Sequence, residues 1–244
     1  MLYIFSAWFL LFLLYSVLGY IVEILSVSIR SKKIVLNRGF LIGPYLPIYG
    51  VGALIMIFFL QGYEDDLLAL FIMGAFYCTL LEYITSLLME KIFKLRWWDY
   101  SQKKFNINGR VCLDNACLFG ICSILVIKLI QPFFKRMIYL LPEVITIILA
   151  IILLFIFVID FIESFFITVR LKKTITKYVH KDATSEIKKE VMNAIRKHTT
   201  LTSRLLKAFP NMSYEANKKF MEFLQLVFET RQQLRYEKKK KKKE

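Results

Sequence analysis

The chain has 244 residues with a formal net charge of +15, and 57% of its residues are hydrophobic and 16% aromatic. Its mean hydropathy of +0.52 exceeds that of a soluble globular domain, which excludes an ordinary water-soluble fold. The first apolar stretch follows no basic segment and is far longer than a signal peptide, so we expect it to be a retained helix. These features predict an all-α, polytopic membrane protein.

Five apolar stretches follow one another along the chain and are predicted to be transmembrane helices. Crossing a bilayer takes about 20 apolar residues. The first, third and fifth stretches reach this length, whereas the second and fourth are shorter. The predicted spans are residues 3–29, 45–60, 67–89, 115–130 and 144–169, which together make a transmembrane domain of residues 1–169.

The charges between these stretches predict the orientation of the chain. Basic residues collect in residues 30–44, in residues 90–114 and after residue 170. The turn at residues 61–66 has only acids as charged residues, and the turn at residues 132–143 has only two basic ones, Lys135 and Arg136. Because basic loops stay in the cytoplasm, we expect the N-terminus outside and the C-terminus in the cytoplasm of a multi-pass cell-membrane protein.

Residues 170–237 are predicted to form a basic cytoplasmic tail. From residue 170 onward the chain carries 21 basic and 8 acidic side chains. Apolar residues recur at helical spacing on both sides of Pro210, which predicts a helical hairpin, and the lysine-rich residues 238–244 are expected to be disordered. Because no nucleic-acid recognition motif accompanies this charge, we expect contact with anionic lipid headgroups rather than with nucleic acid.

Four acidic side chains lie inside the apolar stretches: Glu23, Glu82, Asp160 and Glu163. A charge at the centre of a membrane helix costs roughly 2.5–3.5 kcal/mol, so four unpaired charges would cost on the order of 10 kcal/mol. At about 1.5 Å per residue, all four lie roughly 9–14 Å from the cytoplasmic ends of their predicted helices. We therefore expect one acidic layer, which either binds a substrate or an ion or forms structural salt bridges.

The loop of residues 30–44 offers a partner for this layer, Arg38. The segment from there to residue 50 contains two prolines and three glycines and cannot be an unbroken helix. Either the chain enters the membrane unwound and buried in protein, or a loop precedes an ordinary helix with Pro44 in its first turn. We favour the second interpretation.

The loop of residues 90–114 offers two more partners, Asp99 and Arg110, which could fold under the helices and cap the acidic layer. Its aromatic residues are Trp97, Trp98 and Tyr100, and they lie among basic residues. This pattern is typical of a segment anchored in the lipid headgroup layer, and we expect these three side chains to be interfacial anchors.

The two halves of the predicted membrane domain show a parallel. In each half an acid near the inner end of a long span, Glu23 or Glu82, precedes an Asn/Gly/Arg cluster and then a short span. Repeats with interrupted segments in matching positions are typical of transport sites. We expect the first two spans to superpose on the third and fourth, with Arg38 and Arg110 near equivalent acids.

Three runs of sequence carry a family resemblance: residues 37–50 (NRGFLIGPYLPIYG), 97–101 (WWDYS) and 105–113 (FNINGRVCL). With them, residues 10–120 resemble the bacterial integral-membrane family of CmpB-like, type IV ABC-transporter permeases. The resemblance implies a bacterial inner-membrane protein and a role in transport.

Two functions follow as expectations. The chain contains no G-x-x-x-x-G-K-[ST] sequence, so a permease built from it would need a separate ATPase subunit, and a homodimer would double its five spans. The alternative is a membrane scaffold or assembly subunit in which the acids form salt bridges with loop arginines. A transporter should enclose a polar cavity that reaches the acids, whereas a scaffold should bury them in closed Arg–Glu pairs.

An enzyme is not expected. Both histidines, His180 and His198, lie in the tail without acidic or cysteine neighbours at ligand spacing, so we predict no metal site and no cofactor. The last three of the four cysteines are five residues apart and share no helix face, which is typical of small apolar residues in a reduced protein. No pairing of a nucleophile with a base is visible in the sequence.

Overall fold

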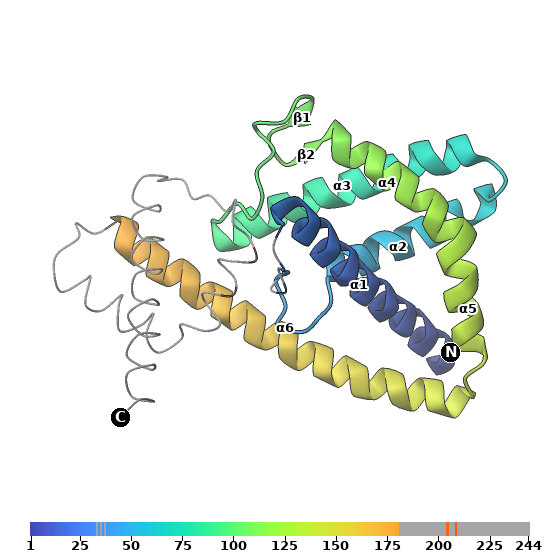
Figure 1. The fold of residues 1–244 in the computed structure, drawn as a ribbon. Helices are drawn as coiled ribbons and strands as arrows, with labels where there is room; N and C mark the ends of the chain where they lie inside the picture. The colour runs from blue at the N-terminus through green and yellow to red at the C-terminus, as the bar shows by residue number, and fades with distance from the viewer. Residues whose placement is uncertain (33, 35, 37, 181–203, 205–207, 209–244) are drawn as a thin grey trace.

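The computed structural model describes residues 1–32, 34, 36, 38–180, 204 and 208 (Figure 1). These residues are mostly helical, as predicted, and the only sheet among them has two short strands. In Figure 1, α1 lies between the long helix α6 and the paired helices α3 and α4. The elements in chain order are α1 (Leu2–Ser31), α2 (Pro47–Leu60), the 3-10 turn η1 (Gln61–Tyr63), α3 (Leu67–Phe93), β1 (Asn106–Ile107), β2 (Val111–Cys112), α4 (Leu113–Leu125), the π-helical turn η2 (Val126–Ile130), α5 (Gln131–Tyr139) and α6 (Glu143–His180).

Four helical stretches in the described part of the chain are long and apolar enough to cross a membrane. They are Leu2–Ile29, Leu67–Phe93, Leu113–Tyr139 and Glu143–Lys173, and a shorter apolar helix covers Pro47–Tyr63. The α-helical part of this shorter stretch has 14 residues, so it is about 21 Å long and does not span the roughly 30 Å of hydrocarbon by itself. The protein is therefore a multi-pass membrane protein with four long spans.

The fourth span differs from the prediction, which ended it at residue 130 and placed a turn from residue 132. The helix instead continues through η2 and α5 to Tyr139, so Lys135 and Arg136 lie on a helix. Pro132 lies at the start of α5, directly after the π-helical turn, a position that tolerates proline better than the interior of a regular α-helix. The preceding π-helical turn shifts the hydrogen-bond register by one residue and so separates the two α-helical parts.

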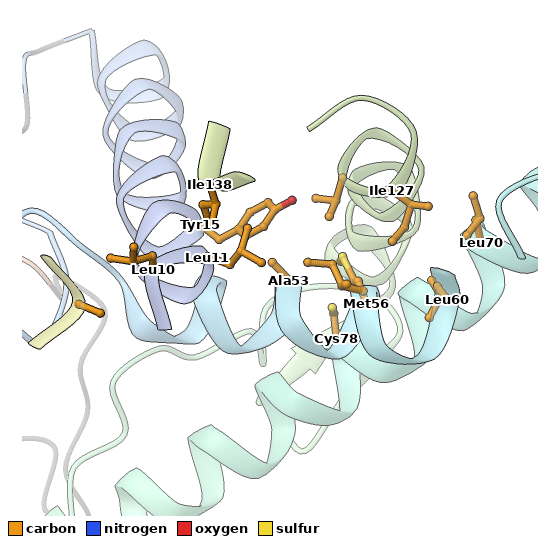
Figure 2. Packing of buried hydrophobic residues seen from close by; sticks show 13 residues of the cluster. Leu10, Leu11, Tyr15, Ala53, Met56, Leu60, Leu70, Cys78, Ile127 and Ile138 are labelled. Carbon is orange, nitrogen blue, oxygen red and sulfur yellow. The ribbon is translucent and has the colours of Figure 1, made fainter. Parts of the chain in front are cut away.

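Buried apolar side chains hold the helices together (Figure 2). Leu11 and Tyr15 of α1 pack with Met56 of α2 and Ile127 of η2, and the Tyr15 hydroxyl donates to Gln131 Oε1 at 2.9 Å. Large apolar side chains on the outside remain exposed, among them Phe58, Phe76 and Phe155. Such a surface suits contact with lipid.

Small residues allow two helix pairs to pack closely. A Cβ atom on Gly50 of α2 would overlap Ser16 Oγ and the Phe12 carbonyl oxygen of α1. In the second pair, a Cβ atom on Gly74 of α3 would overlap the side chain of Ser123 of α4. Glycine and serine at these crossings bring the backbones close together, as is common where helices associate in membranes.

The entry to α2 also differs from the favoured prediction. The helix begins at Pro47 rather than Pro44, and the amide of the residue before it, Leu46, donates to the Ser16 carbonyl at 2.9 Å. Ser16 lies about 22 Å along α1 from the end of that helix at Ser31. Residues 39–46, called the unwound segment below, therefore run back along α1 before α2 starts, with Leu41 and Leu46 buried and Ile42 and Pro44 exposed. This arrangement is the alternative of an unwound entry, here only partly buried in protein, which membrane depth permits only where the backbone polar groups are satisfied.

The predicted helical hairpin of the tail and the lysine-rich residues 238–244 lie outside the described residues. Two tail positions, Arg204 and Ala208, are described, and both contact the loop that follows α1.

Candidate functional site

Three of the four predicted acids lie inside the helix bundle, each on a different helix. Glu23 is on α1, Glu82 on α3 and Asp160 on α6, and each accepts hydrogen bonds from another element. Glu163 is also on α6, but its side chain is exposed and has no hydrogen bond or ion pair to another described residue. The polar layer in the structure therefore rests on three acids rather than four.

Glu23 forms an ion pair with Arg38. Arg38 Nη2 lies 2.5 Å from Glu23 Oε1, and the Tyr49 hydroxyl of α2 donates to Glu23 Oε2 at 3.0 Å. The Arg38 and Glu23 side chains are 16% and 26% exposed, so the surrounding protein shields the pair from most solvent. Arg38 Nη1 donates to the Ala208 carbonyl at 2.5 Å, so a single guanidinium connects α1 to the tail.

Asp160 binds the unwound segment rather than a cation. The amides of Ile42 and Gly43 donate to its two carboxylate oxygens at 2.8 and 2.7 Å, and the Tyr45 hydroxyl donates at 2.5 Å. Ser164, one turn further along α6, adds a fourth hydrogen bond at 3.0 Å. Charge-assisted hydrogen bonds of this kind are stronger than neutral ones, and they explain how α6 accommodates this carboxylate.

Arg204 binds the other side of the same backbone. Its Nη1 donates to the Leu41 carbonyl at 2.6 Å and its Nη2 to the Phe40 carbonyl at 3.0 Å. The Leu41 carbonyl and the Ile42 amide belong to one peptide unit, which is therefore bonded to a cation at its oxygen and to Asp160 at its nitrogen. Asp160 and Arg204 thus bind amides and carbonyls of the unwound backbone from opposite sides.

Glu82 is the most deeply buried of the acids and the least completely bonded. It is 8% exposed. Its Oε1 accepts hydrogen bonds from the Tyr100 hydroxyl at 3.2 Å and from Asn115 Nδ2 at 3.4 Å. Its Oε2 is buried without a partner among the described residues, as is the hydroxyl oxygen of Thr79 one helical turn earlier. The charge of Glu23 acts on Glu82 as a nearby like charge.

Arg110 was expected beside the acid equivalent to Glu23, which is Glu82, and this expectation is wrong. Arg110 Nη1 lies 2.6 Å from Glu90 Oε2, about two helical turns further along α3, and donates to Ser86 Oγ at 3.2 Å. Its guanidinium carbon lies 5.8 Å from the ring centre of Tyr83. These contacts attach the loop between α3 and α4 to the end of α3. They leave Glu82 without an arginine partner among the described residues.

Asp99 does not cap the acidic layer either. It accepts hydrogen bonds from the amide and the hydroxyl of Ser101, at 2.9 and 2.5 Å, and lies 3.6 Å from Arg96 Nη1. Burial acts to raise the pKa of Asp99, but the hydrogen bonds from Ser101 and the charge of Arg96 outweigh it, so the pKa is lowered from its ordinary value. Asp99 therefore organises its own loop.

The predicted interfacial anchors contact protein instead. Trp97 is 2% exposed and packs edge-on against the rings of Phe40 and Phe93. Trp98 Nε1 donates to the Arg110 carbonyl at 3.0 Å, and the Tyr100 hydroxyl reaches Glu82. The anchoring prediction fails for buried Trp97 because a ring enclosed by protein cannot lie among lipid headgroups. Aromatic residues among basic ones are equally typical of a loop that folds back onto its own helices.

The two helix pairs present their acids in similar ways. In the first pair, Glu23 is contacted by Tyr49, the third residue of α2. In the second pair, Glu82 is contacted by Asn115, the third residue of α4. Each acid also accepts a hydrogen bond from the loop that joins the two helices of its pair, Glu23 from Arg38 and Glu82 from Tyr100. The parallel predicted from the acids thus extends to their partners, although the loop partner is a cation in only one of the pairs.

Sequence reasoning did not identify four side chains that complete the site: Tyr45, Tyr49, Asn115 and Arg204. Tyr49 and Asn115 could have been found from the parallel, because both lie just after the helix start that follows an Asn/Gly cluster. Arg204 could not, because nothing distinguishes it from the other basic residues of the tail. No group of three His, Cys, Asp or Glu side chains within the described ranges is placed to hold a metal ion.

Comparison with known proteins identifies the family. A model of the family described as "Putative ABC-transporter type IV" matches residues 10–165, a range that contains all four acids and both loops. No curated protein and no solved structure matches the chain significantly. Because the family match covers well over half of the 244 residues, the chain belongs to this family of ABC-transporter-related membrane proteins, as the resemblance of its loop motifs predicted.

Proposed function

We propose that this protein is a permease-like membrane subunit of an ABC-type transport system and works with a separate ATPase subunit. Its candidate substrate or ion site is the acidic layer, centred on Glu23 and Glu82. One observation carries the proposal. The backbone is unwound at residues 39–46, where its amides bond to Asp160 of α6 and where Leu46 bonds to the middle of α1.

Broken helices are a recurrent feature of transport sites. They expose backbone amides and carbonyls at membrane depth, where these groups bind ligands or position side chains that do. A scaffold needs no such break, because continuous helices satisfy their own backbone groups at lower cost. The unwound segment of this protein needs two charged residues, Asp160 and Arg204, to satisfy it.

The proposed arrangement in the cell follows from the charges of the loops. We place the N-terminus outside and the two loops and the tail in the cytoplasm, where a separate ATPase would bind. The basic tail would contact anionic lipid headgroups, and two copies of the chain would supply enough spans for a translocation path.

Affinity purification of the tagged full chain in mild detergent tests the proposal. The expected result is an ABC-class ATPase, identified by its own G-x-x-x-x-G-K-[ST] sequence, that co-elutes in a fixed ratio and is absent from a control purification of an unrelated polytopic protein with the same tag. Reconstituted with this partner, the Glu82→Gln variant should change the rate of ATP hydrolysis relative to Glu163→Gln, which alters an exposed acid on α6. Repeated absence of any such ATPase would overturn the permease assignment.

A second candidate function is a membrane scaffold, and the surroundings of Asp160 favour it. This carboxylate is fully used in holding the unwound segment, and Glu23 is closed by Arg38. A scaffold predicts that partner proteins other than an ATPase co-elute, and that Glu82→Gln and Glu163→Gln have the same effect in transport and ATP-hydrolysis assays.

A further inference from the structure

We propose that Glu82 is a proton-binding site whose carboxyl group is neutral at neutral pH. The inference deepens and rests on the proposed function, because it gives the candidate site of the permease a ligand class, the proton. It starts from an asymmetry in the carboxyl group. One oxygen accepts two hydrogen bonds and the other, equally buried, accepts none.

This asymmetry matches a carboxylic acid better than a carboxylate. In a neutral acid, one oxygen is a carbonyl that accepts hydrogen bonds and the other is a hydroxyl that donates. Glu82 Oε1, with Tyr100 and Asn115 as donors, fits the carbonyl role. Oε2 has no donor within reach and fits the hydroxyl role. Thr79 Oγ1, one turn earlier on α3, is also buried without a partner among the described residues.

The charges around Glu82 point the same way. No lysine or arginine among the described residues forms an ion pair with it, since Arg38 is taken by Glu23 and Arg110 by Glu90. An ionised carboxylate that is 8% exposed would be desolvated with no cationic partner among the described residues, and only the hydrogen bonds from Tyr100 and Asn115 would compensate for this. The titratable or polar groups that act on it are Glu23 of α1, Cys78 of α3, Tyr100 of the loop between α3 and β1, and Asn115 of α4, and none is a cation.

A metal cation fits this site less well than a proton. Sodium or a divalent ion needs several oxygen ligands, whereas Asn115 presents its NH2 group and Tyr100 its O–H to the carboxylate. These groups already use their hydrogens toward Oε1, and turning them would break both bonds. A proton needs only Oε2 and one acceptor. When the proton is released, Glu82 becomes an anion and is repelled by the charge of Glu23. Binding or releasing the proton therefore changes the net charge of the acidic layer by one.

Infrared spectroscopy of the full chain in lipid nanodiscs tests the inference. Wild-type protein at neutral pH should show the C=O stretching band of a protonated carboxylic acid, shifted on exchange into D2O and lost as the pH is raised. Glu82→Gln should remove this band, and Glu163→Gln, the control on α6, should leave it. Absence of the band in the wild type at neutral pH, or its persistence in folded Glu82→Gln protein, would overturn the proposal.

A second variant keeps the test independent of whether Glu82→Gln folds. Tyr100→Phe removes a hydrogen bond to the carbonyl-like oxygen, so the band should persist and move to higher frequency. Tyr83→Phe is the matched control, because the Tyr83 hydroxyl contacts Asn108 rather than Glu82. An unchanged band in Tyr100→Phe would assign the proton to another acid. The infrared experiment needs no partner protein, so its outcome is independent of the affinity purification. The proton site can be refuted while a co-purified ATPase supports the permease, and it can be supported while no ATPase is found.

Discussion

Replacing Asp160 with alanine should release the unwound segment. The change removes the carboxylate that accepts hydrogen bonds from the Ile42 and Gly43 amides. Hydrogen bonds to a charged group contribute about 1.5–3 kcal/mol each. Because Asp160 is only partly buried, we use the lower value of about 1.5 kcal/mol for each hydrogen bond. Losing the bonds to both amides should therefore cost about 3 kcal/mol. The Tyr45 hydroxyl is left out of this figure, because it can rotate toward another acceptor.

Hydrogen–deuterium exchange measured by mass spectrometry is the appropriate assay, since it reports on this segment locally. A loss of about 3 kcal/mol corresponds to roughly 100-fold faster exchange in peptides that cover residues 39–46. Peptides from the middle of α3 should exchange as in the wild type. Glu163→Ala is the matched control, because it removes an exposed acid from the same helix. If Asp160→Ala and Glu163→Ala left the exchange of residues 39–46 equally unchanged, the argument that Asp160 holds this segment would be refuted.

The remaining predictions concern three other contacts. Glu23→Gln and Arg38→Gln, singly and together, should show a coupling on the order of 1 kcal/mol in an SDS-unfolding double-mutant cycle, whereas simple additivity would mean that the pair is not formed. Gly50→Ala should cost about 1–3 kcal/mol in the same assay because the added Cβ overlaps α1, whereas Gly52→Ala on the same helix meets only ordinary contacts and should change little. The lowered pKa of Asp99 means that its contribution to loop stability is present above the ordinary aspartate value of about 3.9 and is lost as the pH falls through the lowered value. The protection factors of residues 96–101, which are exchange rates corrected for the intrinsic pH dependence, should therefore fall at acid pH in the wild type and be low throughout in Asp99→Ala, and pH-independent protection factors in the wild type would contradict this.

The helices and the buried acids could be predicted from the sequence, because both follow from which residue types occur at which positions. Long apolar stretches require helices in a membrane, and Glu23, Glu82 and Asp160 stand out against them. The same reasoning overestimated Glu163. It lies three residues from Asp160 on the same helix, yet α6 presents it outward. Depth along a helix can be read from sequence, whereas the direction a side chain faces depends on which neighbours pack against that helix.

The partners of the acids were harder to predict. Two of the four hydrogen bonds of Asp160 come from backbone amides, and every residue except proline has an amide, so the sequence does not indicate which ones will bind. Arg110 was paired with the wrong acid because Glu82 and Glu90 lie on the same helix, and only the path of the hairpin β1–β2 brings Arg110 to Glu90. Pro132 was taken as the end of a span because a π-helical turn, which lets the helix continue past it, has no sequence signature.

The peptide unit between Leu41 and Ile42 has a consequence for how the tail communicates with the membrane. Its oxygen is bonded to Arg204 and its nitrogen to Asp160, so each bond polarises the unit in the sense that strengthens the other. Withdrawing Arg204 therefore weakens the attachment of the unwound segment to α6, and loosening that attachment weakens the hold on Arg204. Thermodynamic linkage is reciprocal: a partner that binds the tail and thereby loosens the start of α2 must bind more tightly, by the same free energy, when the start of α2 is already loosened.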